Sequence, residues 1–160
     1  MDDNLVNQWK IWYHSINDTN WNNESYKLIY TIQNVFDISV LDELMEGNHL
    51  QNAMFFIMKD DIFPTWEDPD NREGSFISYK IPAPVLKENW MLIIKKIIFQ
   101  DFLINKDKNL EINGFSISPK KEFNIIKIWL KNYDPKFVDC LNEYPPYIVK
   151  DKMIHRKHIT

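Results

Sequence analysis

The sequence predicts an α+β fold, a single antiparallel sheet with its helices on one face. Three observations predict it. The chain has 160 residues, 44% of them hydrophobic and 26% charged, which suits one domain covering residues 1–160. Most of its apolar segments alternate with the two-residue period of strands, and few have helical spacing. The order of these segments favours helices segregated to one side of a sheet.

The first part of the chain is expected to hold two strands and a helix. Apolar residues alternate over residues 5–13 and again over residues 26–32, with the polar loop NDTNWNNES between the two segments. Asn34 is then expected to cap a helix over residues 35–46, and Gly47 is expected to stop it.

The middle of the chain is expected to hold two more strands and a longer helix. Residues 53–59 are β-like, and the acidic turn IFPTWEDPDNREG leads to a strand over residues 75–81, which Pro82 ends. Residues 87–102 are predicted to form an amphipathic helix, with its isoleucines facing inward and its lysines outward.

The last third of the chain is predicted to hold a strand pair. The strands cover residues 112–118 and 123–130, and the turn SPKKE joins them. A short helix over residues 134–142 follows, and prolines end it. A brief strand and a basic tail are expected after these prolines.

Bulk properties exclude several classes of function. The net charge is −4, so any contact with nucleic acid must be a local site rather than a broad basic surface. Cys140 is the only cysteine, which excludes an internal disulfide and any multi-cysteine metal site. No apolar run is long enough for a membrane span, and the N-terminus does not resemble a signal peptide. We therefore expect a soluble, cytoplasmic protein without metal or cofactor.

Two tryptophans in polar loops indicate a binding site. Trp66 and Glu67 are adjacent in an otherwise polar turn, and Trp21 lies in a loop rich in Asn and Asp. Two aromatic planes can sandwich a flat base, and a cationic base such as 7-methylguanine adds a cation–π attraction. The Glu67 carboxylate can accept both hydrogen bonds from the guanine N1–H and 2-amino edge.

The chain resembles the eukaryotic translation initiation factor 4E family of mRNA cap-binding proteins. The resemblance covers about residues 4–130 through WKIWYH, NDTNW, FFIMKDDIFPTWED, ENWM and INGFSISPKKEFNIIKIWLK, and all six tryptophans match. It implies a curved sheet with about three helices on its convex face and the cap site in its concave face. It also implies a non-enzymatic monomer that binds capped mRNA and a scaffold resembling initiation factor 4G, or a dedicated equivalent of that scaffold.

The resemblance also assigns roles to individual residues. Trp21 and Trp66 would stack on the cap base, Glu67 would bind the guanine edge, and Trp129 would contact the N7 methyl group. Lys120 would hold the phosphates, with Lys121, Arg72 and Lys127 as further candidates. The partner-binding surface would comprise Leu5, Val35, Ile38 and Met91.

Four departures from the family pattern stand out. Ile125 occupies the position of a second phosphate-binding lysine. Ser39 replaces the tryptophan that docks the scaffold, and Lys95 lies where the family has an apolar scaffold contact. The part of the chain after Trp129 is short, so KDKMIHRKHIT replaces or abbreviates the last strand and the loop that covers the cap.

Alternatives stay open at this point. The clustered carboxylates Asp60, Asp61, Glu67, Asp68, Asp70 and Glu73 could hold Mg²⁺ in a hydrolase. The chain could be an interaction module without cap binding, or a cap-binding competitor that recruits no scaffold. Some site residues also have structural interpretations. Trp129 could belong to the core, Trp21 could cover the core, and Lys120 with Lys121 could form a solvated hairpin turn. Trp9, Trp12 and Trp90 are expected in the core.

Overall fold

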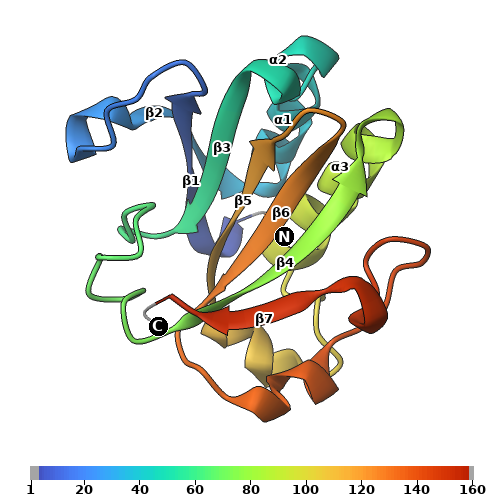
Figure 1. The fold of residues 1–160 in the computed structure, drawn as a ribbon. Coiled ribbons are helices and arrows are strands. Elements are labelled where there is room, and N and C mark those ends of the chain that lie inside the picture. Colours follow the sequence, from blue (N-terminus) through green and yellow to red (C-terminus); the bar gives the residue numbers. More distant parts are fainter. Residues whose placement is uncertain (1–3, 159–160) are drawn as a thin grey trace.

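A single curved sheet of seven strands organises the molecule (Figure 1). The computed structural model describes residues 4–158, apart from the side chains of residues 47 and 48. The strand order is β2-β1-β3-β5-β6-β4-β7, and every neighbouring pair is antiparallel, as predicted. The strands are β1 Asn4–Ser15, β2 Lys27–Asn34, β3 Ala53–Lys59, β4 Ser75–Pro82, β5 Ile112–Pro119, β6 Phe123–Leu130 and β7 Ile154–Lys157.

The α-helices all lie on one side of this sheet, behind it in Figure 1. This confirms the predicted α+β arrangement. No helix among residues 4–158 is long and apolar enough to cross a membrane. The α-helices are α1 Ile38–Leu44, α2 Gly47–Asn52 and α3 Leu86–Ile98. The 3-10 turns are η1 Asn23–Ser25, η2 Val35–Asp37, η3 Ala83–Val85, η4 Lys106–Glu111, η5 Pro135–Cys140 and η6 Lys150–Lys152.

Strand alternation separates the two faces of the sheet. On β4, Ile77, Tyr79 and Ile81 are at most 2% exposed and pack in the main core beneath the helices. Trp9 and Trp90 lie in the same core, as predicted. The opposite, open face carries a smaller apolar cluster of Phe56, Met58, Ile62 and Trp129, against which the partly buried Trp12 packs. The helices therefore cover one face of the sheet, and the other face carries only this smaller apolar cluster.

The predicted helix over residues 35–46 is wrong in its boundaries. Asn34 does act as a cap, but it caps η2, through a capping box in which Asp37 bonds back to the backbone of Asn34. The α-helix proper begins only at Ile38. Gly47 does not stop a helix; it is the first residue of α2.

Two further boundaries differ from the prediction. Helix α3 ends at Ile98 rather than near residue 102, because Gln100 takes a left-handed conformation with φ of 58°. The turn lets Phe102 enter the main core, where it is fully buried. At the C-terminus the final strand lies within the predicted basic tail, where β7 pairs with β4.

Candidate functional site

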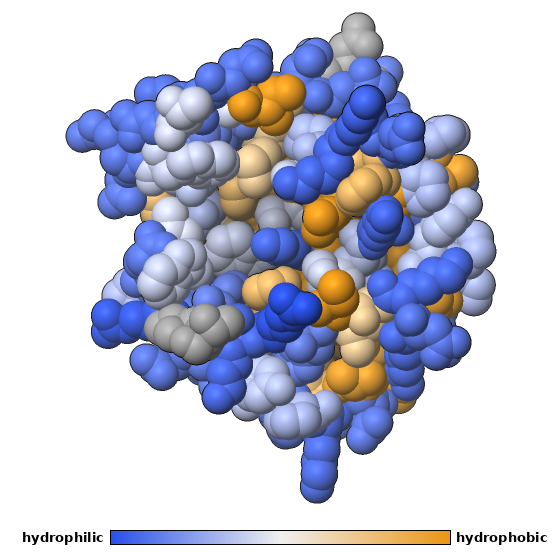
Figure 2. Space-filling model, in the orientation of Figure 1, coloured by the Kyte–Doolittle hydropathy of each residue, from blue (hydrophilic) through white to orange (hydrophobic). Residues whose placement is uncertain are grey.

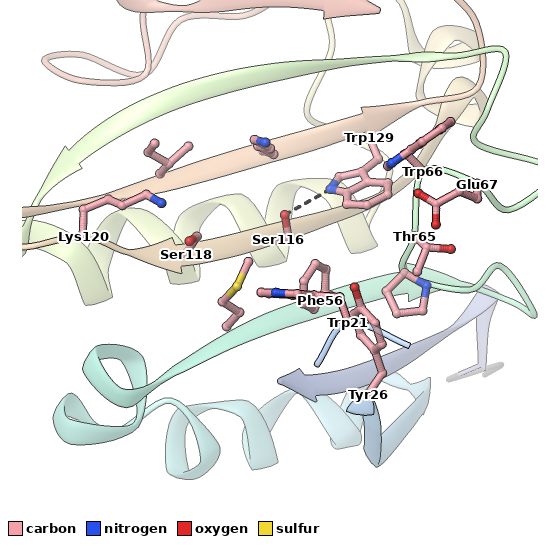
Figure 3. A pocket seen from close by; sticks show the side chains of 14 residues that line it. Trp21, Tyr26, Phe56, Thr65, Trp66, Glu67, Ser116, Ser118, Lys120 and Trp129 are labelled. Carbon is pink, nitrogen blue, oxygen red and sulfur yellow. Dashed lines mark hydrogen bonds between the residues drawn. The ribbon is translucent and has the colours of Figure 1, made fainter. Parts of the chain in front are cut away.

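The open face of the sheet holds a pocket of about 400 Å³. Loops that are far apart in sequence form its walls, and strands β3, β5 and β6 contribute to its lining (Figure 3). Six of the predicted site residues line it together: Trp21, Trp66, Glu67, Lys120, Lys127 and Trp129. Most of the residues that the sequence assigned to one binding site therefore lie together in the folded chain.

The ring of Trp21 stacks on that of a buried histidine. The Trp21 ring lies parallel to that of His14, with centroids 3.8 Å apart and an interplanar angle of 2°. His14 is fully buried, and its two ring nitrogens lie 2.9 Å from the carbonyl oxygens of Ser15 and Asn20. Trp21 itself is 51% exposed, so one indole face is supported while the side chain still reaches the pocket. Trp21 therefore covers a buried side chain with one face and also lines the pocket.

A buried amide pair fixes the turn that carries Trp66 and Glu67. The Asn71 side chain donates to the carbonyl oxygens of Phe63 and Thr65 at 3.1 and 2.9 Å. Asn113 in turn donates to the Asn71 amide oxygen at 3.1 Å. Both asparagines are almost fully buried, so the turn is held by hydrogen bonds that solvent does not weaken.

Trp66 and Trp21 occupy opposite sides of the pocket (Figure 3). Trp66 is 46% exposed. Asp68, the next acidic residue after Glu67, shapes the turn by accepting hydrogen bonds from the backbone N–H groups of Phe63 and Asp70 at 3.0 and 2.9 Å. Its carboxylate is therefore structural, whereas the Glu67 carboxylate lines the pocket.

Trp129 belongs to both the core and the site. It is 7% exposed and packs edge-on against Phe56, yet it lines the pocket floor. Its indole Nε1–H donates to the Ser116 hydroxyl oxygen at 3.0 Å, which fixes the ring orientation (Figure 3). The core position expected as one interpretation of Trp129 is thus confirmed, and its place in the pocket floor leaves it able to contact a ligand.

The pocket is electrically polar along its length. At one end, burial and then the nearby Glu67 carboxylate raise the pKa of Tyr26. On the pocket floor, burial and then the positive charge of Lys120 lower the pKa of Lys127. Figure 3 places Lys120 at the end opposite Trp66 and Glu67. The site therefore suits a ligand with a cationic aromatic head and an anionic tail.

Two predicted phosphate residues do not line this pocket. Lys121 is exposed in the turn between β5 and β6, and Arg72 is exposed in the turn after Pro69. Ile125 does line the pocket, so an apolar side chain occupies the place of the second lysine expected from the resemblance. Lys127 is two residues further along β6 and lines the pocket as well, so it supplies the second ammonium group instead.

The C-terminal segment adds a residue that sequence reasoning did not place at the site. Through β7, His158 comes to lie with its ring centroid 5.2 Å from that of Trp129 and 5.7 Å from that of Phe76. Burial and then the positive charge of Lys127 lower the pKa of His158 to about 4. His14, Tyr26, Phe56 and Ser116 were also missed, since strand periodicity alone distinguishes none of them from ordinary strand residues.

Two carboxylates just before the acidic turn have structural partners, as does Asp68 within it. Asp60 accepts from the side chain of Asn7 and the backbone of Gln8, and Asp61 pairs with Lys10 at 2.9 Å. Within residues 4–158, no group of three His, Cys, Asp or Glu side chains is arranged to hold a metal ion.

The predicted partner surface is only partly accessible. Ile38 and Met91 are 8% and 7% exposed and pack in the main core, and Leu5 is partly buried against the same core. Val35 is 36% exposed, and its neighbour Phe36 is 69% exposed. Of the four predicted partner residues, Val35 in η2 is therefore the exposed one.

Comparison with known proteins identifies the family of the chain. The family profile "Eukaryotic initiation factor 4E" matches residues 4–143. The chain belongs to the eukaryotic initiation factor 4E family. Members of this family are initiation factors and not enzymes, so the hydrolase alternative is not supported.

Relatives of this 4E family member occur in distant organisms. Eukaryotic translation initiation factor 4E of Dictyostelium discoideum is 27% identical over 135 residues, covering 79% of this chain and 52% of that protein. A 4E homolog of Acanthamoeba polyphaga mimivirus is 24% identical over 135 residues, covering 71% and 50%. This chain thus spans about half the length of these curated relatives.

Solved structures of the 4E family share the fold. The complex of Ascaris suum eIF4E-3 with an m7G cap has a TM-score of 0.75 at 20% identity, covering 87% of this chain and 79% of that one. The complex of C. elegans eIF4E-3 with the 4E-binding protein Mextli and a cap analog has a TM-score of 0.72 at 19% identity, covering 82% and 76%.

Proposed function

We propose that this chain binds the 7-methylguanosine cap of mRNA and acts, as a monomer in the cytoplasm, in translation initiation. The observation that carries the proposal is the polarity of the pocket on the open face. Aromatic planes and a carboxylate lie at one end and Lys120 lies at the other, while Lys127 also lines the pocket. A methylated guanine carries positive charge and its triphosphate is anionic, so the ligand has the complementary polarity.

The aromatic end would recognise the base. Trp21 and Trp66 would stack on its two faces, and the cationic charge of the methylated base strengthens that stacking. Glu67 would accept hydrogen bonds from the N1–H and 2-amino groups. Trp129, whose ring is fixed by Ser116, would lie against the N7 methyl group.

The basic end would hold the triphosphate. Lys120 and Lys127 both line the pocket, and burial, followed by the positive charge of Lys120, lowers the pKa of Lys127. A phosphate chain between the two ammonium groups would relieve this repulsion. Lys121 and Arg72 are assigned no primary role, because neither lines the pocket.

A second role, as a competitor that binds cap without recruiting the usual scaffold, is supported by the surface formed by α1 and α3. Ser39 offers no aromatic anchor, and its hydroxyl donates to the backbone carbonyl of Phe36 at 2.8 Å. Lys95 on α3 is exposed and adds a charge there. An aromatic anchor contributes roughly 2 kcal/mol or more to an interface. An initiation factor with a dedicated scaffold would instead use the exposed ring of Phe36.

Two binding experiments test these proposals. Retention on a cap-analogue resin, followed by elution with 7-methyl-GTP but not GTP, is expected for a cap-binding protein; failure to bind the resin would contradict it. Pull-down with a helical scaffold peptide separates the two roles. Binding that Phe36→Ala abolishes supports the initiation factor, and absence of binding by a cap-competent protein supports the competitor.

A further inference from the structure

Three lysines, two on the open face of the sheet and one in η6, are each held over an aromatic ring. An exposed lysine normally loses much side-chain freedom when it binds an anion, and a ring beneath the ammonium group reduces that cost in advance. The Nζ-to-centroid distances are 4.5 Å for Lys127 over Phe76, 4.1 Å for Lys80 over Phe123 and 5.5 Å for Lys152 over Tyr147.

The two lysines on the sheet lie on the same face as the proposed cap pocket. Strand register establishes this for β4 and β6, where Lys80 lies opposite Ile125 and Pro82 opposite Phe123. Side chains two positions apart on a strand point to the same side, so Phe123 follows Lys127 and Trp129 along one face of β6. Ile126 and Ile128 between them are buried in the main core on the other face.

A second hollow of about 480 Å³ lies at the far end of this row. Its lining includes both Lys80 and Lys152, with Phe123 and Tyr147. Glu122 also lines it, so the two ammonium groups outnumber one carboxylate. Figure 2 views this face directly, and hydrophilic residues cover much of the area over β4, β6 and β7.

We propose that this second hollow binds the phosphodiester backbone of the RNA nucleotides that follow the cap. The proposal rests on the proposed cap-binding function, because the cap pocket sets where the RNA strand begins. Trp129 and Phe123 are six positions apart on β6, a distance of about 20 Å at roughly 3.3 Å per residue. The triphosphate, held by Lys120 and Lys127, would direct the chain along this row toward Lys80 and Lys152.

The expected contact is electrostatic and independent of base sequence. Each lysine–phosphate contact with a single strand steepens the dependence of log affinity on log salt by roughly 0.7. The two lysines of the second hollow should therefore add about 1.4 to the slope measured with a capped RNA. They should add nothing to the slope for 7-methyl-GTP, which ends before it reaches them.

The test compares 7-methyl-GTP with a capped hexanucleotide RNA, each titrated at several salt concentrations against the full chain. The variant is the double substitution Lys80→Gln, Lys152→Gln. Its matched control is Lys106→Gln, Lys136→Gln, which makes the same change in net charge at exposed lysines that line neither hollow. Unchanged 7-methyl-GTP affinity in the variant shows that the fold and cap pocket are intact.

The proposal expects the capped RNA to bind more tightly than 7-methyl-GTP in the parent and the control, with the advantage and the extra salt slope lost in the variant. Equal affinity for the two ligands in the parent, or a tighter binding of capped RNA that survives in the variant, overturns the proposed RNA site in the second hollow. Either result leaves cap binding intact. If 7-methyl-GTP itself does not bind the parent, the proposed function fails, and the proposed RNA site fails with it.

Discussion

His14 and Trp21 lie face to face, with ring centroids 3.8 Å apart and planes 2° from parallel. The histidine cannot easily turn, because it is fully buried and both ring nitrogens lie 2.9 Å from carbonyl oxygens. A loop tryptophan would otherwise sample many orientations, and ordering it costs free energy upon binding. The buried imidazole thus pre-orients one of the two proposed stacking planes.

The first prediction concerns this support. Stacked aromatic pairs contribute roughly 0.5–1.5 kcal/mol beyond burial, so His14→Ala should weaken binding of 7-methyl-GTP about two- to twelvefold. His14→Phe should weaken it less, because it keeps a ring beneath Trp21 while losing the contacts with Ser15 and Asn20. Fluorescence titration measures both variants, and circular dichroism checks their folding. A folded His14→Ala protein with parental affinity would show that the stack does not pre-orient Trp21.

The second prediction concerns the Glu67 carboxylate as the group that binds the guanine edge. Charge-assisted hydrogen bonds contribute roughly 1.5–3 kcal/mol, so Glu67→Ala should reduce affinity for 7-methyl-GTP by about one to two orders of magnitude. Glu67→Gln should be nearly as harmful, since an amide offers one acceptor where the guanine edge needs two. Asp68→Asn is not a suitable control, because Asp68 holds the turn. Calorimetric titration showing parental affinity in Glu67→Ala would remove Glu67 from the site.

The third prediction concerns the phosphate end. Lys120→Ala, Lys127→Ala should weaken binding of 7-methyl-GTP strongly but leave binding of the bare 7-methylguanosine almost unchanged. Lys121→Ala is the matched control, because Lys121 lies in the same hairpin but does not line the pocket. Added salt should reduce the difference between the two ligands, because charges are screened beyond a Debye length of about 8 Å at physiological ionic strength. A larger loss in Lys121→Ala than in the double variant would place the triphosphate elsewhere.

The fourth prediction concerns pH and His158. Burial, followed by the charge of Lys127, lowers the pKa of His158 from 6.5 to about 4. The unfolded chain therefore binds a proton below pH 6.5 that the folded chain does not, and the free energy of unfolding falls as pH drops from 6.5 toward 4. Burial also lowers the pKa of His155, which acts in the same direction.

Urea denaturation at pH 7 and pH 5 measures this effect. His158→Gln removes one of the two groups, so its free energy of unfolding should fall less between the two pH values than that of the parent. An equal fall in both proteins would show that His158 takes up its proton equally well in the folded and unfolded chain.

Much of the fold could be predicted because its signals are local. Alternating apolar residues indicated β3, β4, β5 and β6 within a residue or two, and the unusual placement of Trp66 beside Glu67 in a polar turn indicated a site. What failed depends on distant packing. Nothing next to Gly47 shows that α2 begins there, and Gln100 turns left-handed so that Phe102 can enter the core.

The missed site residues have the same explanation. His14 and Ser116 lie on different strands. Their roles arise only from contacts in the folded chain, of His14 with Trp21 and of Ser116 with Trp129. The tail KDKMIHRKHIT gave no strand signal, and only its register against β4 brings His158 beside Trp129. Strand pairing sets these contacts, and one sequence does not specify pairing.

Methyl discrimination tests the central claim most directly. If Trp21 and Trp66 sandwich a cationic base, loss of the N7 methyl group removes the positive charge and with it the cation–π part of the stacking. Each such interaction contributes roughly 0.5–2 kcal/mol, so two faces predict at least about a fivefold preference. Tryptophan fluorescence titration with 7-methyl-GTP and GTP measures it. We expect strong quenching and at least that preference for 7-methyl-GTP; equal affinity for the two nucleotides would contradict the proposed function.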